Sequence, residues 1–151
     1  MFRSILVGFD GSSHARRALD EAVALAQAHH AALAVMTVVP DPRTMAGIGT
    51  LGYGGADLAR ARCELEKDYA RSLDAAVDAL PDDLPVTKRV AHGKPGPELV
   101  KATREDNHDL VVVGSRGLGT AASLVLGSVS GYVLHHLAGA ALVVHDEPVA
   151  A

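Results

Sequence analysis

The chain has 151 residues, of which 48% are hydrophobic and 21% are charged, enough for one domain with a substantial core. A net charge of −4 and only 3% aromatic residues argue against nucleic acid as a partner. Nucleic-acid-binding proteins usually carry an excess of basic residues for the phosphates and aromatic side chains on which bases stack. No apolar run approaches the roughly 20 residues of a membrane helix, and the amino-terminal run ends at Asp10, too early for a signal peptide. The single cysteine, Cys63, excludes an intrachain disulfide and favours a cytoplasmic location.

Strand-like segments recur along the chain. Residues 3–9 and 32–39 are short apolar runs typical of buried strands, and residues 109–113 and 140–145 repeat the pattern near the carboxyl end. Residues 86–91 predict a partly polar strand, which belongs at the edge of a sheet.

Helix-like segments lie between these strands, over about 13–30, 57–80, 97–107 and 128–137. The first has a largely alanine apolar side, which lets a helix lie close to a sheet. The second carries apolar side chains at helical spacing: Leu58, Leu65, Tyr69, Leu73, Val77 and Leu80. Strands that alternate with helices predict a parallel sheet with helices on both faces and right-handed crossovers.

Residues 40–56 are expected to be irregular, as a flexible lid or linker or as a disordered stretch. Within them, Gly47-Ile-Gly49-Thr-Leu-Gly52 has the form G-x-G-x-x-G. Two prolines separate it from the strand that ends at Val39, so it is not interpreted as a dinucleotide fingerprint. The tail, residues 147–151, is expected to be loose.

A glycine-rich segment follows the strand over 109–113. Gly114 ends the strand, Gly117 follows after two residues, and Gly127 and Ser128 come nine residues later. Glycine permits φ > 0 and a close approach of backbone to ligand, and the free N–H groups at a helix start bind anions. The pattern therefore predicts a phosphate-binding loop. The alternative is an ordinary turn in which Ser128 caps the helix.

The spacing Gly114-x2-Gly117-x9-Gly127-Ser128 resembles the signature of the ATP-binding branch of the universal stress protein family. The resemblance extends from the strand before Asp10 to Leu142-Val143-Val144. It implies a Rossmann-like domain over 1–146, of the adenine nucleotide alpha hydrolase type, with strand order 3-2-1-4-5. It also implies a small regulatory module of the stress response that binds ATP with Mg²⁺, and a homodimer formed through strand 140–145. AMP and a cyclic nucleotide are the alternative ligands.

The resemblance also assigns the site residues. Gly8 and the main chain of Val38 would line the base pocket, and Asp10 would contact the adenine or the ribose. The phosphate-binding residues would be Gly114, Gly117, Gly127, Ser128, Val129 and Ser130, with Arg116 as a candidate cation. In a sheet of this order ligands bind where the strand order reverses, between the first and fourth strands, and Asp10 and Gly114 stand at those two strand ends.

No catalytic residue stands out. Thr120 follows Gly119 where a Walker loop needs Gly-Lys, and Val129 stands at the centre of Gly127–Gly131, so this is not a G-x-S-x-G elbow. The eight histidines form no metal-binding motif. We expect no catalytic or metal site in the chain itself. A slow or partner-dependent ATPase and a nucleotide-independent dimeric scaffold are the alternative functions.

Overall fold

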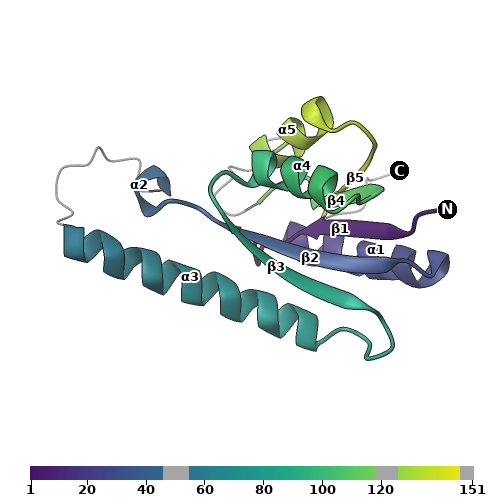
Figure 1. Cartoon of the computed structure of the whole chain (residues 1–151), viewed down its shortest axis with the longest axis horizontal. Coiled ribbons are helices and arrows are strands. Elements are labelled where there is room, and N and C mark those ends of the chain that lie inside the picture. Colours follow the sequence, from purple (N-terminus) through teal and green to yellow (C-terminus); the bar gives the residue numbers. More distant parts are fainter. Residues whose placement is uncertain (46–54, 118–125, 147–151) are drawn as a thin grey trace.

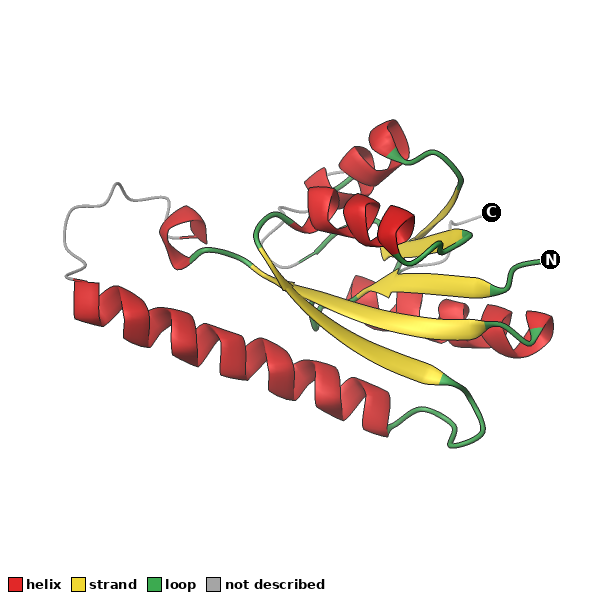
Figure 2. Ribbon diagram, viewed as in Figure 1, coloured by secondary structure: helices red, strands yellow, loops and turns green. Residues whose placement is uncertain are grey.

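The computed structural model describes residues 1–45, 55–117 and 126–146. These residues form an α/β fold with one parallel sheet in the predicted order, β3-β2-β1-β4-β5 (Figure 2). The strands are β1 (Ser4–Gly8), β2 (Ala32–Val39), β3 (Val86–His92), β4 (Leu110–Gly114) and β5 (Ala140–Val144). The helices are α1 (Ser13–His29), α2 (Pro42–Met45), α3 (Gly55–Asp78), α4 (Pro95–Glu105) and α5 (Ser128–His136). No helix in the described parts of the chain is long and apolar enough to cross a membrane.

Helices cover both faces of the sheet, as predicted (Figure 1). Ile5 and Val7 of β1 pack in the cluster that contains α1 and Leu73 of α3, whereas Leu6 packs in the cluster that contains α4 and α5. This alternation follows from the two-residue period of a strand. Ala18 and Ala22 are both fully buried, so the alanine side of α1 does lie directly on the sheet.

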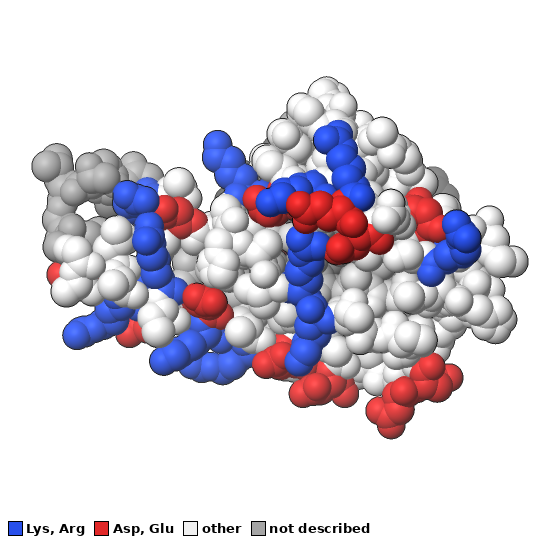
Figure 3. Space-filling model, viewed as in Figure 1, with Lys and Arg blue, Asp and Glu red and all other residues white. Residues whose placement is uncertain are grey.

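The predicted edge strand and the start of α1 are confirmed, whereas α3 and α4 each begin two residues earlier than predicted, at Gly55 and Pro95. Strand β3 is an edge strand, and its Lys88 reaches α3, where Nζ lies 2.6 Å from Oδ1 of Asp74. Figure 3 shows basic and acidic side chains lying side by side on this face rather than in separate fields. At the start of α1, Oγ of Ser12 accepts a hydrogen bond from the N–H of Ala15 at 3.1 Å, so Ser12 is the helix cap.

Part of the segment predicted to be irregular is helical. Asp41 precedes α2, accepts the N–H of Arg43 at 3.0 Å, and forms ion pairs with Arg43 and Arg62 that lower the pKa of its carboxyl. The two prolines suggested a break, but Pro42 stands at the first helical position, where its missing N–H costs nothing. Residues 46–54, with the G-x-G-x-x-G sequence, and the tail 147–151 lie outside the described residues.

The apolar stripe predicted for α3 is only partly buried. Leu73 is its one fully buried member, at 1% exposure, and Leu58, Leu65 and Tyr69 are half-buried. Figure 1 gives the reason, because the amino-terminal half of α3 extends past the sheet.

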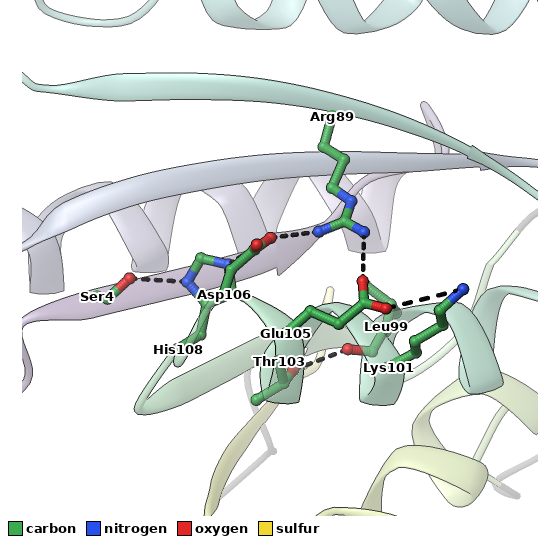
Figure 4. Close-up of polar contacts among 8 residues, drawn as sticks. All are labelled: Ser4, Arg89, Leu99, Lys101, Thr103, Glu105, Asp106 and His108. Carbon is green, nitrogen blue, oxygen red and sulfur yellow. Dashed lines mark hydrogen bonds and ion pairs between the residues drawn. The ribbon is translucent and has the colours of Figure 1, made fainter.

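A polar network at the carboxyl end of α4 fixes this helix to the sheet (Figure 4). Arg89 of β3 donates to the carboxylates of Glu105 and Asp106. Nearby, Nδ1 of His108 lies 2.7 Å from Oγ of Ser4 in β1, and burial lowers the pKa of His108. With its carboxyl end held to β1 and β3, α4 directs its amino end toward the carboxyl edge of the sheet.

Candidate functional site

A cavity of about 290 Å³ opens at the carboxyl edge of the sheet, at the reversal of strand order between β1 and β4. Every residue assigned to the site from the sequence lines it: Gly8, Asp10, Val38, Gly114, Arg116, Gly117, Gly127, Ser128, Val129 and Ser130. The other lining residues are Phe9, Ala15, Met36, Pro40, Tyr69, Pro95, Leu99 and Val113. The fold thus brings together segments that are more than a hundred residues apart in the sequence.

One part of the cavity wall is apolar. Met36 and Leu99 are almost fully buried, and Val113 of the central sheet lies beside them. Gly8 leaves room for the side chain of Leu99, because a Cβ on Gly8 would lie only 3.0 Å from Cδ1 of Leu99. Apolar walls with a few polar groups are typical of sites for planar organic ligands.

The backbone of Val38 faces this part of the cavity. The carbonyl of Met36 accepts the N–H of Phe9 at 2.8 Å, toward β1, whereas the carbonyl of Val39 accepts the N–H of Gly93, toward β3. Backbone groups alternate in direction along a strand, so the N–H and C=O of Val38 point to the β1 side. Strand β1 ends at Gly8, so these groups point past its end. The N–H and C=O of Val38 are therefore placed to form hydrogen bonds with the edge of a planar base.

The amino end of α5 forms the polar wall. Gly127 is its cap residue, without a side-chain capping bond, and the first intrahelical bond runs from the N–H of Gly131 to the carbonyl of Gly127 at 3.0 Å. The N–H groups of Ser128, Val129 and Ser130 therefore have no acceptor within the helix. All three residues line the cavity, where the positive end of the helix dipole favours an anion.

Two side chains of this wall differ in what they can offer. Ser128 is exposed, is the first helical residue rather than the cap, and lines the cavity. Ser130 is 1% exposed, and its hydroxyl donates to the carbonyls of Ser115 and Gly127 at 3.2 and 3.0 Å. A hydroxyl carries one hydrogen, and in this structure that of Ser130 is already donated to backbone carbonyls, so its hydroxyl is not placed to donate to a phosphate. Its backbone N–H is the group that can serve.

The sequence suggested that the glycines of the loop allow turns with φ > 0, but in the structure they provide space for close packing. Gly114, Gly117 and Gly127 all lie outside the left-handed region of φ. What each lacks is room for a Cβ, which at Gly114 would lie 2.8 Å from the carbonyl carbon of His14. At Gly117 it would lie 2.5 Å from Oδ2 of Asp10, and at Gly127 it would lie 3.0 Å from a backbone carbonyl oxygen. The glycines thus allow the loop to pack closely against α1 at Gly114, against the β1–α1 turn at Gly117 and against its own backbone at Gly127.

Asp10 lies between the β1–α1 turn and the glycine loop, and its carboxylate contacts both. Its Oδ1 accepts the N–H of Ser12 at 3.0 Å, and its Oδ2 lies against Gly117, so the carboxylate joins the β1–α1 turn to the glycine loop. The capping side chain of α1 is that of Ser12, so Asp10 is not the residue that caps this helix. Arg116 is half-buried and is the only Lys or Arg among the described lining residues.

The sequence reasoning missed three polar or rigid lining positions. Pro40 directly follows β2 and Pro95 opens α4, so the rule that ligands bind at the carboxyl ends of parallel strands could have found both. Tyr69 lies in the middle of α3 and was read as one more core position. Burial, and then the charge of Asp10, raise the pKa of the Tyr69 phenol. No local signal distinguishes this tyrosine from its neighbours in the stripe.

The sequence and the fold are both similar to those of known universal stress proteins. The sequence model of the universal stress protein family matches residues 1–145. A universal stress protein of Thermus aquaticus, named for the QAH/OAS sulfhydrylase 3′ region, is 35% identical over 133 residues, which cover 86% of this chain and 89% of that protein. A universal stress protein solved in complex with cAMP is 27% identical, with a TM-score of 0.61, and the match covers 97% of this chain and 98% of that one. The fold is also that of an Archaeoglobus fulgidus universal stress protein solved with dAMP, with a TM-score of 0.60, 16% identity and coverage of 95% and 98%.

Proposed function

Because the chain belongs to the universal stress protein family, we propose that it binds an adenine nucleotide, namely ATP with Mg²⁺, in the cavity between β1 and β4. The main observation behind this proposal is that Arg116 and the three N–H groups at the start of α5 line the same cavity as the apolar side chains of Met36, Leu99 and Val113. The 27% identical protein that was solved with cAMP supports the ligand class.

The order of the strands fits the order of groups in a nucleotide. Across the sheet edge, β2 presents Val38, β1 presents Asp10, and β4 leads into Gly117 and the start of α5. A nucleotide could therefore lie along the sheet edge in an extended conformation, with its base against Val38, its sugar beside Asp10 and its phosphates at the amino end of α5. Phosphate on a helix amino end is a well-understood anion site.

The magnesium ion would be held mainly by phosphate oxygens and water, as is usual for nucleotide-bound Mg²⁺. Within the described residues, no group of three or more His, Cys, Asp or Glu side chains could hold a metal. Asp10 is the only carboxylate among the described lining residues, and one of its oxygens already accepts the N–H of Ser12. We therefore propose a nucleotide-binding regulatory module without rapid turnover, because phosphoryl transfer needs a residue that positions the attacking group.

We further propose that residues 1–146 act as a single domain and assemble as a homodimer through β5. Among the described strands, β5 pairs only with β4, and its half-exposed residues Ala140 to Val143 are all apolar. An apolar edge strand invites pairing with a second chain, and two identical edges can meet antiparallel about a two-fold axis.

Calorimetric titration with ATP and Mg²⁺ tests the ligand and its position together. We expect Ser128→Ala to weaken binding by about 10- to 150-fold, since a hydrogen bond to a charged group contributes about 1.5–3 kcal/mol. Ser13→Ala is the matched control, because Ser13 is also exposed and also the first residue of its helix, yet lies outside the cavity lining. Wild-type protein that does not bind would disprove the function. If both variants bind like the wild type, the phosphates lie elsewhere.

A further inference from the structure

Tyr69 reaches the cavity from α3, and the neighbouring turn of this helix fixes its position. It stands four residues before Leu73, on the same face of the helix, and Leu73 is 1% exposed in the core. Between them, Ser72 packs on the β1–α1 turn, where a Cβ on Gly11 would lie 3.0 Å from Oγ of Ser72. Tyr69 is thus held half-buried beside the turn that carries Asp10.

The position of Asp10 tells which part of a ligand Tyr69 faces. Asp10 follows β1, between the β2 wall with Val38 and the β4 loop with Gly117. Its negative charge acts on the phenol of Tyr69, in addition to the effect of burial, and both raise the pKa of Tyr69. Both residues line the cavity, and Ser72, three residues after Tyr69, packs on the turn that carries Asp10, so the phenol and the carboxylate belong to one part of the site. The phenol keeps its proton at neutral pH.

We propose that the hydroxyl of Tyr69, together with the carboxylate of Asp10, binds the sugar of the nucleotide and makes the site selective for an intact ribose. This inference depends on the proposed function, because it needs a nucleotide in the cavity. The chemistry is complementary, since a carboxylate only accepts hydrogen bonds whereas a phenol donates and accepts. A ribose hydroxyl can donate to Asp10 and accept from Tyr69, and a deoxy position can do neither.

The test compares Tyr69→Phe with wild type against three ligands: ATP, 2′-deoxy-ATP and 3′-deoxy-ATP, each with Mg²⁺. The change removes one hydroxyl and keeps the ring. We expect ATP to bind about 2- to 13-fold more weakly, the equivalent of a net hydrogen bond of about 0.5–1.5 kcal/mol. With the deoxy nucleotide that lacks the contacted hydroxyl, the variant and the wild type should bind equally.

Tyr132→Phe is the matched control. Tyr132 stacks on His136, with ring centroids 3.9 Å apart, and lines a separate groove on α4 and α5. Its variant should bind all three nucleotides like the wild type, and thermal unfolding should show that both variants are folded. If wild-type protein binds but Tyr69→Phe changes no affinity, or weakens all three ligands equally, the inference is wrong while the proposed function holds. Wild-type protein that binds none of the three would overturn both.

Discussion

Gly114 and Gly117 belong to the same loop, yet the structure predicts opposite consequences for alanine at the two positions. At Gly114 the new Cβ would lie 2.8 Å from the carbonyl carbon of His14, which cannot move unless α1 moves. At Gly117 it would lie 2.5 Å from Oδ2 of Asp10, the end of a side chain that can rotate away. We expect Gly114→Ala to lower the free energy of unfolding, and Gly117→Ala to lower the affinity for nucleotide.

The expected magnitudes follow from these contacts. Neither position needs the left-handed region, so alanine should stabilise each variant by about 0.4–1 kcal/mol through the unfolded chain. Overpacking costs about 1–3 kcal/mol, and the backbone contact at Gly114 favours the upper part of this range, about 2–3 kcal/mol, which leaves a net loss of about 1–2.6 kcal/mol. For a chain of this length that loss lowers the unfolding midpoint by about 2–10 °C. At Gly117, weakening the hydrogen bond that the N–H of Ser12 donates to Asp10 costs about 0.5–1.5 kcal/mol, so the free energy of unfolding should stay within about 1 kcal/mol of wild type.

Binding should show the reverse order. A displaced Asp10 carboxylate loses a charge-assisted bond to the ligand, so Gly117→Ala should weaken ATP by about 10- to 150-fold. Gly114→Ala, measured well below its unfolding midpoint, should bind with less than about a threefold change, since its clash lies on the α1 side. Circular dichroism melts without nucleotide and calorimetric titration with ATP give the two quantities. A Gly114→Ala variant as stable as wild type, or a Gly117→Ala variant of wild-type affinity, would refute this account of the loop.

Three further predictions concern assembly, turnover and acid stability. Val143→Lys in β5 should give a folded monomer, with a light-scattering mass near 15.6 kDa, and a persisting dimer would place the interface elsewhere. Purified protein with ATP and Mg²⁺ should turn over at well below about 1 s⁻¹, and about 10 s⁻¹ without a partner would contradict a binding module. Burial alone would raise the pKa of Asp109, but the N–H groups of Arg3 and Ser4 bind its carboxylate at 2.8 and 3.1 Å and lower it on balance. Asp109→Asn should therefore destabilise the protein by about 1 kcal/mol at pH 7. The difference should vanish in urea unfolding as the pH falls from about 4 through the lowered pKa, and a constant difference would argue against the charge.

Local sequence was sufficient to predict a helix or a strand where the characteristic pattern of residues lies within one short segment. The alanine-rich periodic run over 13–30 predicted a helix that packs closely on the sheet, and α1 does so. The polar alternation around Lys88 predicted an edge strand, because only an edge leaves a strand half exposed. The ends of β1 and β4 then located one crevice for Asp10 and the glycine loop. The helix and the edge strand depend on backbone periodicity, which a short stretch of chain determines by itself, whereas the crevice followed from the strand order that the family resemblance implied.

Contacts between distant segments decided the rest. Gly114 is small because the backbone of His14 lies against it, and Ser130 turns its hydroxyl inward because the carbonyl of Ser115 is there to accept it. Tyr69 faces the cavity although its spacing is that of a core residue, because the sheet covers α3 at Leu73 but not along the whole helix. The sequence by itself therefore determined the strands and the four longer helices, and with the family resemblance it also determined the strand order and the place of the crevice. Which atoms line it depends on side chains brought together from far apart in the chain, and only the packed structure brings them there.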